Sequence, residues 1–510
     1  MLRKVKVENG WVEGLPAADP RITSFKGIPF AAPATGENRW RAPQPVKDWD
    51  GVLQCHAFGP IAMQAKPGKN HEDIYTREWN YDENIAQSED CLQLNVWTPA
   101  KSADENLPVY VWYYGGGLQV GNPAEMEFDG ERLARRGVVV VTVNYRVNVF
   151  GFLCHPEITA ENPDAPANFG NLDQQAATRW VKRNIAAFGG NPNQITIGGQ
   201  SAGGGSVMSQ LTSPQNEGLF QGAIVESGVM TQLYPGGRVP GKAGRDFHAA
   251  EEEGVKFFDF LGVKTLAEAR ALDAEYIRDK AVEYKGFWGT VVDNKFSVGV
   301  AFDLFRENKR WMVPVMFGHT SSEFPSVPNV STMEEFRALA VELFGEDADE
   351  FLALCPSQFD SVTEVKKKAS IIGIEYAIRI LSEANAASGA NAPLYYYNFD
   401  PSIPGWDNPG TFHSVDLWFF FETLAKCWRP FTGKHYDLAR LMCNYWANFI
   451  KNGDPNGRDA DGSRMPQWET MTPDTPRAMY FGDGFAEYGR EEPSELMQFL
   501  VRQYFKKNSK

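Results

Sequence analysis

The sequence predicts an α/β fold built on a large, mostly parallel central sheet with helices on both faces. Between about residues 105 and 230, short apolar runs alternate with stretches of amphipathic helical spacing. The apolar runs, such as VVVVTVNYR, are rich in Val throughout, which indicates strands that are covered on both faces. The chain has 510 residues, of which 43% are hydrophobic, and this is enough to fill one large core.

The elements follow one another in the order of a doubly wound sheet. Strand-like runs lie at LPVYVWYY, VVVVTVNYR, QITIG and GAIVESG, and helix-like runs lie between them. In the helix-like run before QITIG, apolar side chains recur at helical spacing at Ala177, Trp180, Val181 and Ile185. Strands and helices that alternate in this way form βαβ units, whose strands pair in parallel.

The sequence also predicts what precedes this pattern and which helical insertions interrupt it. Residues 1–60 are strand-like and rich in turns, and we expect them to add antiparallel strands at the edge of the sheet. Two stretches, about 230–310 and 330–392, are largely helical insertions, whereas WMVPVMFG and APLYYYNF return to strand character. The sequence contains no internal repeat and no long linker, so residues 1–510 are expected to form a single domain with helical insertions.

The composition argues against several kinds of partner. With 50 Lys and Arg against 65 Asp and Glu, the net charge is −15, so we expect no nucleic-acid partner. The N-terminal MLRKVKVENGWVEG alternates apolar and polar residues and lacks the apolar run of a signal peptide. No stretch reaches the roughly 18 to 20 apolar residues of a membrane span. We therefore expect a cytoplasmic protein with no membrane span.

The cysteines show no metal-type spacing, and several of them lie in apolar runs. We interpret most of them as buried free thiols, and we expect neither a metal ion nor another cofactor. The six residues are Cys55, Cys91, Cys154, Cys355, Cys427 and Cys443.

The stretch GGQSAGGGSV contains the pattern G-x-S-x-G, with Ser201 at its centre. In this pattern a strained strand-to-helix turn lifts a nucleophilic serine out of a sheet. The apolar run ITIG precedes it and a helix-like run follows it, as the pattern requires. A phosphate-binding loop does not fit, because the lysine that such a loop needs is absent. A glycine-rich turn without chemistry is the remaining alternative.

A second glycine run, Gly115 to Gly117, ends the apolar strand VYVWYY. Consecutive glycines allow backbone N–H groups to converge on one point, which is what a developing oxyanion requires. A dinucleotide-binding turn is the alternative, since glycines also follow a strand there. Two features oppose this alternative: Pro123 and its polar neighbours do not open a helix, and the next strand ends in Asn144 rather than in an acid.

A base and an acid for Ser201 are expected on loops that follow later strands. His413, in NPGTFHSVDLWFFF, follows a strand-like run and a loop rich in Pro and Gly. Glu323, in VPVMFGHTSSEF, follows another strand-like run. Taken singly, His413 could be a packed core residue and Glu323 a solvated surface group. The order Ser201, Glu323, His413 nevertheless matches the order of triad residues in α/β-hydrolases.

Together these residues resemble the type-B carboxylesterase and cholinesterase-like family of α/β-hydrolases. The resemblance extends over most of the chain and rests on FKGIPFAAPATGENRWRAPQP, SEDCLQLNVW, YYGGG, NYRVNVFGFL, NFGNLDQQAATRWVKRNIAAFGGNP, GGQSAGG, GHTSSEF, GTFHSVD and YWANFIKNGDPN. It implies that Ser201 is the nucleophile, His413 the base and then the acid, and Glu323 the carboxylate that orients His413. It also implies an oxyanion hole formed by the N–H groups of Gly116, Gly117 and Ala202.

Several positions depart from the family pattern. Members often have Glu before the nucleophile, whereas this chain has Gln200, so selectivity for cationic alcohols is not expected. Many bacterial relatives have His before the glycines, where this chain has Tyr114. Secreted relatives pair a cysteine at the position of Cys91 with one just after a Gly-Pro, where this chain has Ala62. The usual disulfide is therefore not expected, which agrees with a reducing compartment.

The expected function is hydrolysis of small-molecule carboxylic esters through an acyl-enzyme intermediate. A thioesterase or an amidase would use the same three residues, and a non-catalytic binding protein of the same fold is a further alternative. We expect Ser227, in VESG, to support the triad with its hydroxyl. The expected pocket walls are aromatic or apolar residues near the motifs, namely Tyr114, Leu118, Trp288, Phe324 and Trp418.

Overall fold

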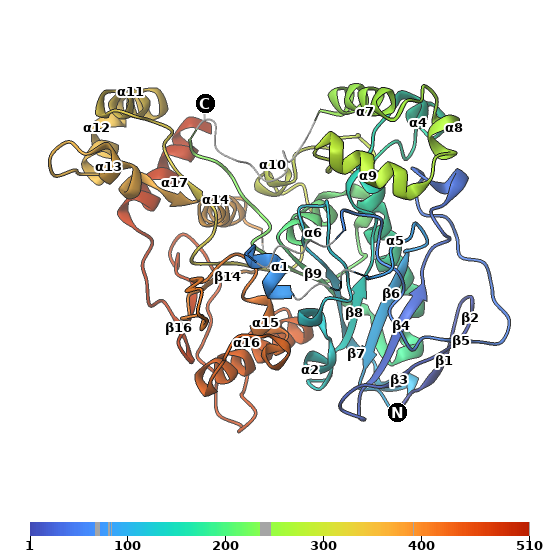
Figure 1. Cartoon of the computed structure of the whole chain (residues 1–510). Helices are drawn as coiled ribbons and strands as arrows, with labels where there is room; N and C mark the ends of the chain where they lie inside the picture. Colours follow the sequence, from blue (N-terminus) through green and yellow to red (C-terminus); the bar gives the residue numbers. More distant parts are fainter. Residues whose placement is uncertain (67–71, 80–81, 83, 235–245, 391, 509–510) are drawn as a thin grey trace.

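The computed structural model describes residues 1–66, 72–79, 82, 84–234, 246–390 and 392–508. Its main feature is an eleven-stranded sheet, counted over these residues (Figure 1). From one edge to the other the strands are β16 (Phe485–Tyr488), β15 (Met479–Gly482), β14 (Leu394–Phe399), β11 (Val315–Thr320), β10 (Gly222–Glu226), β9 (Gly190–Gln200), β7 (Leu107–Tyr113), β8 (Val139–Val143), β6 (Gln93–Thr98), β4 (Thr23–Pro29) and β3 (Leu15–Pro16).

The middle of this sheet is parallel and its edges are antiparallel. Every pair from β15 through β14, β11, β10, β9 and β7 to β8 is parallel. At the edges, β16 pairs antiparallel with β15, and β6, β4 and β3 add antiparallel strands beyond β8. The prediction of a mostly parallel sheet with antiparallel N-terminal strands is therefore confirmed.

Not all N-terminal strands join the main sheet. The strands β1 (Lys4–Val7), β2 (Gly10–Glu13) and β5 (Val52–Gln54) form a separate three-stranded sheet. A two-stranded sheet joins β12 (Pro325–Ser326) to β13 (Ile371–Ile372).

Helices cover both faces of the main sheet. Neighbouring side chains of a strand point to opposite faces, so the contacts of two adjacent residues show which helix lies on each face. On β7, the ring of Trp112 packs against Phe420 of α15 (Leu417–Phe420). The hydroxyl of the next residue, Tyr113, lies 2.5 Å from Thr178 Oγ1 of α5 (Phe169–Asn184) on the other face. The helical spacing predicted around Ala177 thus corresponds to α5.

The helices that connect the strands lie in five groups along the chain. The first group, before β9, consists of α1 (Ile74–Trp79), α2 (Glu131–Ala134), α3 (Asn148–Phe152), α4 (Pro156–Glu161) and α5, and the second, after β9, is α6 (Ala202–Thr212). The third group, between β10 and β11, consists of α7 (Phe247–Leu261), α8 (Leu266–Arg270), α9 (Ala274–Tyr284) and α10 (Ala301–Arg306). The fourth, between β11 and β14, consists of α11 (Met333–Phe344), α12 (Ala348–Leu354), α13 (Val362–Ala369) and α14 (Gly373–Ala387), and the fifth, after β14, of α15, α16 (Gly433–Asn452) and α17 (Glu495–Asn508).

Short 3-10 turns complete the described elements. They are η1 (Gly36–Asn38), η2 (Ala103–Glu105), η3 (Met126–Phe128), η4 (Ile185–Phe188), η5 (Pro214–Asn216), η6 (Gly345–Asp347) and η7 (Leu424–Lys426).

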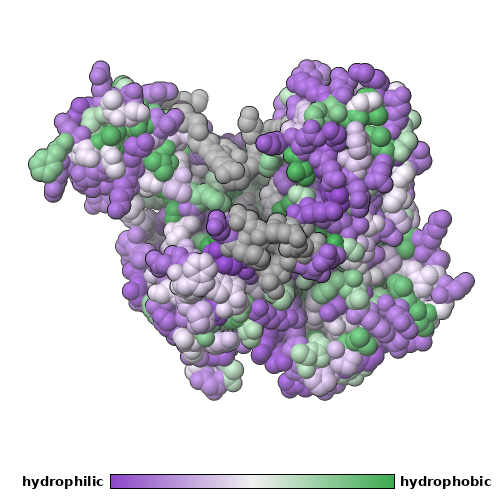
Figure 2. Space-filling view, viewed as in Figure 1, coloured by the Kyte–Doolittle hydropathy of each residue, from purple (hydrophilic) through white to green (hydrophobic). Residues whose placement is uncertain are grey.

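Two of the helix groups form lobes that stand apart in the molecule. One lobe holds α7, α8 and α9, and the other holds α11, α12 and α13, with a depression of the surface between them (Figures 1 and 2). They correspond to the stretches expected as helical insertions, although residues 235–245 lie outside the described residues. Both lobes follow the carboxyl ends of strands β10 and β11 in the chain, so they flank the sheet edge where loops can carry a site.

Two further expectations concerned the state of the cysteines and the presence of a membrane-spanning helix. All six cysteines carry free thiols, five of them buried and Cys427 partly buried, which confirms the interpretation from the sequence. Burial raises the pKa of the Cys55 thiol to about 12 and that of Cys355 to about 11. In the described ranges, no helix combines the length and the apolar character that a bilayer crossing requires.

Candidate active site

Ser201 occupies a strained turn between β9 and α6. Its backbone angles are φ 55° and ψ −124°, a conformation that costs a residue with a side chain on the order of 1–3 kcal/mol. Its N–H donates to the carbonyl oxygen of Glu226 at the end of β10, at 2.9 Å. The turn therefore leaves the serine side chain outside the sheet, where Ser201 is only partly buried.

The glycines around Ser201 are required because other backbone segments pass very close. A Cβ added at Gly203 would lie 2.0 Å from the carbonyl oxygen of Tyr113. A Cβ at Gly199 would lie 2.5 Å from the carbonyl carbon of Gly203. Real Cβ atoms do not approach backbone atoms this closely, so the G-x-S-x-G pattern has a steric basis in this fold.

His413 and Glu323 come from two neighbouring parallel strands. Glu323 follows β11, and His413 ends the loop that follows β14. Parallel strands end at the same edge of a sheet, so the two loops meet there. Nδ1 of His413 donates to Oε2 of Glu323 at 2.7 Å, and both side chains are buried.

The carboxylate of Glu323 accepts further hydrogen bonds. Ser227 Oγ donates to its Oε1 at 2.5 Å, and Thr320 Oγ1 lies 3.3 Å from the same oxygen. Burial alone would raise the pKa of Glu323, but the neighbouring His413 and these hydrogen bonds lower it overall. Glu323 is thereby kept as a carboxylate, and the position of Ser227 agrees with the expected support.

The pKa of His413 moves in the complementary direction. Burial alone would lower it, but Glu323 raises it, and Asp416 adds to this effect. A histidine held in this way has one ring nitrogen fixed toward a carboxylate and the other, Nε2, free to exchange a proton.

Nε2 of His413 lies 3.3 Å from the side-chain nitrogen of Gln200. Among the described residues, no hydrogen bond joins Ser201 Oγ to His413. Hydrogen bonds between a nucleophile and its base commonly tighten when substrate binds. Gln200 directly precedes Ser201 in the chain, so its contact with His413 places the turn of Ser201 beside the loop that carries the histidine.

The glycine run lies directly beside the serine. A Cβ added at Gly115 would lie 3.1 Å from Cβ of Ser201. Gly116 and Gly117 have φ angles of 111° and 66°, which favour glycine. In the part of the chain that the structure describes, their N–H groups and that of Ala202 donate no hydrogen bond. Ala202 is the first residue of α6, so its N–H has no acceptor within the helix.

The residues expected as pocket walls lie in different surroundings. Phe324 is 47% exposed, and its ring centre lies 4.9 Å from that of His413. Leu118 is partly buried beside the glycines. Tyr114, Trp288 and Trp418 are buried; their partners are Tyr145, Phe257 and Trp79, respectively.

Sequence reasoning missed a pair of buried acids behind the triad. Asp416 accepts a hydrogen bond from the hydroxyl of Tyr397 at 2.9 Å, and burial raises its pKa to about 6. Glu226 accepts one from Trp446 Nε1 at 2.7 Å, and burial raises its pKa well above the ordinary range. Both acids stand within the motifs HSVD and VESG, but nothing in the sequence distinguishes a buried acid there from an exposed one.

The loop that carries His413 is anchored by a buried ion-pair network. Arg429 is completely buried, and its Nε lies 2.8 Å from Oε2 of Glu78 in α1. Its Nη1 lies 3.0 Å from Oδ1 of Asp407, a residue of the loop that ends at His413. The network therefore joins α1 to the loop after β14.

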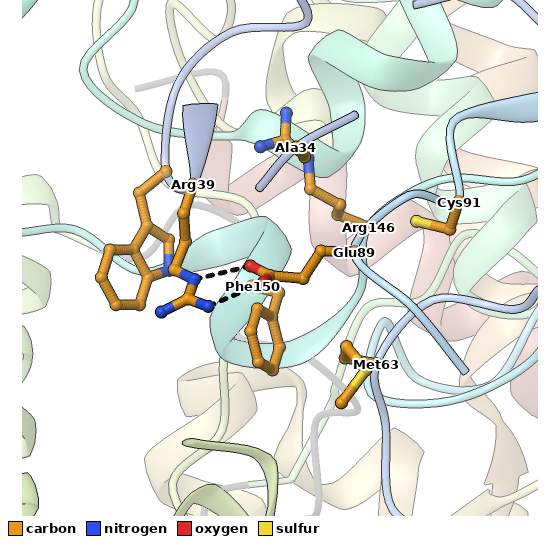
Figure 3. Close-up of a pocket in the computed structure, with 8 residues that line it drawn as sticks. Ala34, Arg39, Met63, Glu89, Cys91, Arg146 and Phe150 are labelled. Carbon is orange, nitrogen blue, oxygen red and sulfur yellow. Dashed lines mark hydrogen bonds and ion pairs between the residues drawn. The ribbon is translucent and has the colours of Figure 1, made fainter. Parts of the chain in front are cut away.

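A separate small cavity lies away from these residues. In Figure 3, Arg39 and Glu89 face each other across it, with Nε and Oε1 at 2.6 Å. Its volume of about 10 Å³ has room for about one water molecule, too little for an ester substrate. Its walls are Ala34, Arg39, Trp40, Met63, Glu89, Cys91, Arg146 and Phe150, none of which belongs to the candidate site.

Comparisons with known proteins bear on the family of this chain. A family model described as the carboxylesterase family matches residues 2–497. The chain is 31% identical to a fumonisin B1 esterase of Sphingopyxis macrogoltabida, over 91% of this chain and 84% of that protein. It is also 31% identical to a para-nitrobenzyl esterase of Bacillus subtilis, over 89% of this chain and 90% of that protein.

Two solved structures of esterases are similar to this chain over nearly its whole length. One structure of a PNB esterase superposes with a TM-score of 0.78 at 28% identity, and the match covers 98% of this chain and 99% of the other. A carboxylesterase of Geobacillus stearothermophilus superposes with a TM-score of 0.74 at 29% identity, covering 96% of this chain and 98% of the other.

Proposed function

The chain belongs to the carboxylesterase family and has its α/β-hydrolase fold, and we propose that it cleaves carboxylic esters with Ser201, His413 and Glu323 as its catalytic triad. Membership of this family makes it an ester-hydrolysing enzyme that acts on small-molecule esters. The observation that carries the triad is the 2.7 Å contact between His413 Nδ1 and Glu323 beside the strained turn of Ser201.

In the first half of the reaction, Nε2 of His413 takes the proton of Ser201 Oγ as this oxygen attacks the ester carbonyl carbon. A bond forms between Oγ and that carbon, and the carbonyl oxygen becomes an oxyanion. The N–H groups of Gly116, Gly117 and Ala202 stabilise it, and each such donor is worth about 2.7–4 kcal/mol in comparable sites. Glu323 stabilises the imidazolium that forms.

The tetrahedral intermediate then collapses. The bond to the alcohol oxygen breaks, and His413 gives its Nε2 proton to that oxygen, which leaves an acyl group on Ser201. In the second half, His413 takes a proton from water, the water oxygen attacks the acyl carbon, and Ser201 leaves with the proton. The products are a carboxylic acid and an alcohol.

The assignment of the nucleophile is tested by Ser201→Ala. We expect hydrolysis of p-nitrophenyl acetate to fall by at least about 10³-fold, because no acyl-enzyme can form. Intact-mass measurement should show one fluorophosphonate adduct on the wild-type chain and none on the variant. Ser209→Ala, in the same helix α6, is the matched control and should keep full activity. Unchanged activity of Ser201→Ala would refute the triad.

Thioesters and amides could in principle be cleaved by the same residues. The relatives are named for esters, which favours ester hydrolysis. Turnover of a matched p-nitrophenyl ester, thioester and anilide decides between the three classes. We expect the highest kcat/KM for the ester, and a higher value for the thioester or the anilide would overturn this choice.

A further inference from the structure

The turn that carries Gly116 and Gly117 is held by carboxamide side chains, one from within the turn and two from elsewhere in the chain. We infer that Asn148 and Gln119 are positioning residues, which fix the direction of the N–H groups that receive the oxyanion. This inference rests on the proposed function, since it concerns the same oxyanion hole. It assigns to these amides a contribution to the rate rather than to substrate binding.

Every carbonyl group from Gly116 to Gln119 has a donor. The carbonyl oxygen of Gly116 accepts from the N–H groups of Gln119 and Val120, at 3.0 and 3.1 Å. That of Gly117 accepts from Gln119 Nε2 at 3.1 Å. That of Leu118 accepts from the backbone N–H of Asn148 at 2.6 Å.

Asn148 uses its whole side chain in this arrangement. Its Nδ2 donates to the carbonyl oxygen of Gln119 at 3.1 Å and to that of Met63 at 2.8 Å. Its Oδ1 accepts from the N–H of Phe150 at 3.2 Å. The residue has φ 49°, a left-handed conformation that Asn tolerates better than most side chains. Asn148 thus joins the turn to the chain before α1 and to the start of α3.

Gln119 joins the same turn to a different part of the molecule. Besides the Gly117 carbonyl, its Nε2 donates to the carbonyl oxygen of Trp288 at 2.5 Å. Trp288 is buried and packs against Phe257 of α7, with ring centres 5.3 Å apart. The turn is therefore connected, through the carbonyl of Trp288, to a residue that packs against α7.

The end of the turn is closed by a third carboxamide. Gln64 is buried; its Oε1 accepts from the N–H of Gly121 at 2.8 Å, and its Nε2 donates to the carbonyl oxygen of Gly121 at 3.0 Å. The three amide side chains therefore hold backbone groups of Gly117, Gln119 and Gly121.

Planarity of the peptide bond links these contacts to catalysis. The carbonyl of Gly116 shares one rigid plane with the N–H of Gly117, and it is held by the backbone N–H groups of Gln119 and Val120. The carboxamides act on this plane through the neighbouring peptides, because Gln119 Nε2 holds the carbonyl of Gly117 and Asn148 Nδ2 holds that of Gln119. Glycines have wide backbone freedom, and two in succession would otherwise sample many orientations. Donors that are already aimed need no rearrangement when the oxyanion forms, and this lowers the barrier rather than KM.

Two variants test the inference without touching the reacting groups. Asn148→Gly keeps the left-handed backbone and the N–H toward Leu118 but removes both Nδ2 bonds. Gln119→Met keeps a similar side-chain length and removes the donor to Gly117. For each we expect kcat to fall by roughly 10- to 100-fold with KM changed by less than about threefold. Binding of a trifluoromethyl ketone, which mimics the tetrahedral intermediate, should weaken in step with kcat/KM.

The matched control is Asn106→Gly. Asn106 also has a left-handed backbone, with φ 55°, but it lies at the opposite end of β7 from the glycines and is exposed. This variant should keep kcat and inhibitor affinity, and the thermal midpoint of all three variants shows whether they are folded.

The inference is overturned if folded Asn148→Gly and Gln119→Met keep wild-type kcat and inhibitor affinity, or if only KM rises. This result is distinct from failure of the proposed function, in which Ser201→Ala would stay active. If Ser201→Ala is inactive and the amide variants are unaffected, the triad stands and the positioning role is wrong.

Discussion

Gln200 places a neutral amide beside the proposed base. Its Nε2 lies 3.3 Å from Nε2 of His413, at a position where many family members resembling this chain have a glutamate. With no charge on that side, the pKa of His413 is set by burial, which lowers it, and by Glu323, which raises it more. The histidine must be neutral to accept the serine proton, so activity should fall as the pH drops through this raised pKa.

Replacing Gln200 with Glu should therefore move the acid limb of the pH–rate profile to higher pH. A carboxylate near Nε2 favours the imidazolium and raises the pKa of His413 further. Profiles of kcat/KM over about pH 5 to 9 measure the shift. Gln200→Met, which is neutral and of similar length, should leave the limb in place. Superimposable profiles for Gln200→Glu and the wild type would contradict this account of His413.

At the scale of single residues, the sequence predicted the proposed catalytic residues but not the amide side chains that hold the glycine turn. Ser201, Glu323 and His413 are recognisable from local patterns and from their order in the chain. The roles inferred for Gln119 and Asn148 depend on partners far away in the sequence, such as the Trp288 carbonyl 169 residues from Gln119. An amide side chain carries no local signal of such a partner, so the sequence could not reveal it.

At the scale of elements, the junction of β9 and α6 shows how close packing constrains sequence. Its glycines belong to one helix start, but their surroundings differ. A Cβ at Gly203 would lie 2.0 Å from the Tyr113 carbonyl oxygen, whereas a Cβ at Gly205 would meet no atom nearer than the Gly228 carbonyl oxygen at 3.6 Å.

The two positions should thus respond oppositely to alanine. We expect Gly203→Ala to lower the free energy of unfolding by about 2–3 kcal/mol and to reduce kcat, because backbone atoms of the turn must shift. Gly205→Ala should be neutral or stabilising by up to about 1 kcal/mol, because alanine favours the helix interior. Urea unfolding and kcat measure both. Equal effects at the two positions would show that the steric argument is wrong.

Strands could be predicted from the sequence better than the surroundings of aromatic side chains could. The short apolar runs identify buried parallel strands because they need no partner to be recognised. β7, β8 and β10 lie within such runs, whereas β9 contains QITIG but begins earlier, at Gly190. Trp288 and Trp418 were expected to line a pocket, and both are buried. The indole of Trp418 donates to Glu78 of α1, a contact between segments 340 residues apart. Aromatic side chains serve cores and pockets alike, so only tertiary packing separates the two.

At the scale of the whole molecule, the network around Arg429 links α1 to the histidine loop. Arg429 and Glu78 are fully buried; among the described residues Arg429 pairs with Glu78 and with Asp407, and Asp407 also pairs with Arg77. Removing one partner of such a network leaves an uncompensated buried charge. By contrast, Arg183 forms a half-exposed pair with Glu8 at 2.9 Å on the surface.

Arg429→Met should consequently lower the free energy of unfolding by about 3–5 kcal/mol, and Arg183→Met by less than about 1 kcal/mol. Urea midpoints compare the two variants directly. The loop that carries His413 should also loosen in Arg429→Met, which a lower kcat at temperatures well below the unfolding transition would reveal. A midpoint equal to that of Arg183→Met would show that the network is dispensable.

The placement of β14 beside β11 has a consequence for the newborn chain. Gln200 and His413 are 213 residues apart, and Glu323 lies between them. A ribosome adding about 5–20 residues per second needs roughly 10 to 40 seconds to release the histidine after the serine turn. During this interval the nascent polypeptide holds the proposed nucleophile without its proposed proton acceptor. With the triad proposed above, products that stop before His413 cannot hydrolyse esters, and hydrolytic competence arises only after this residue has been added.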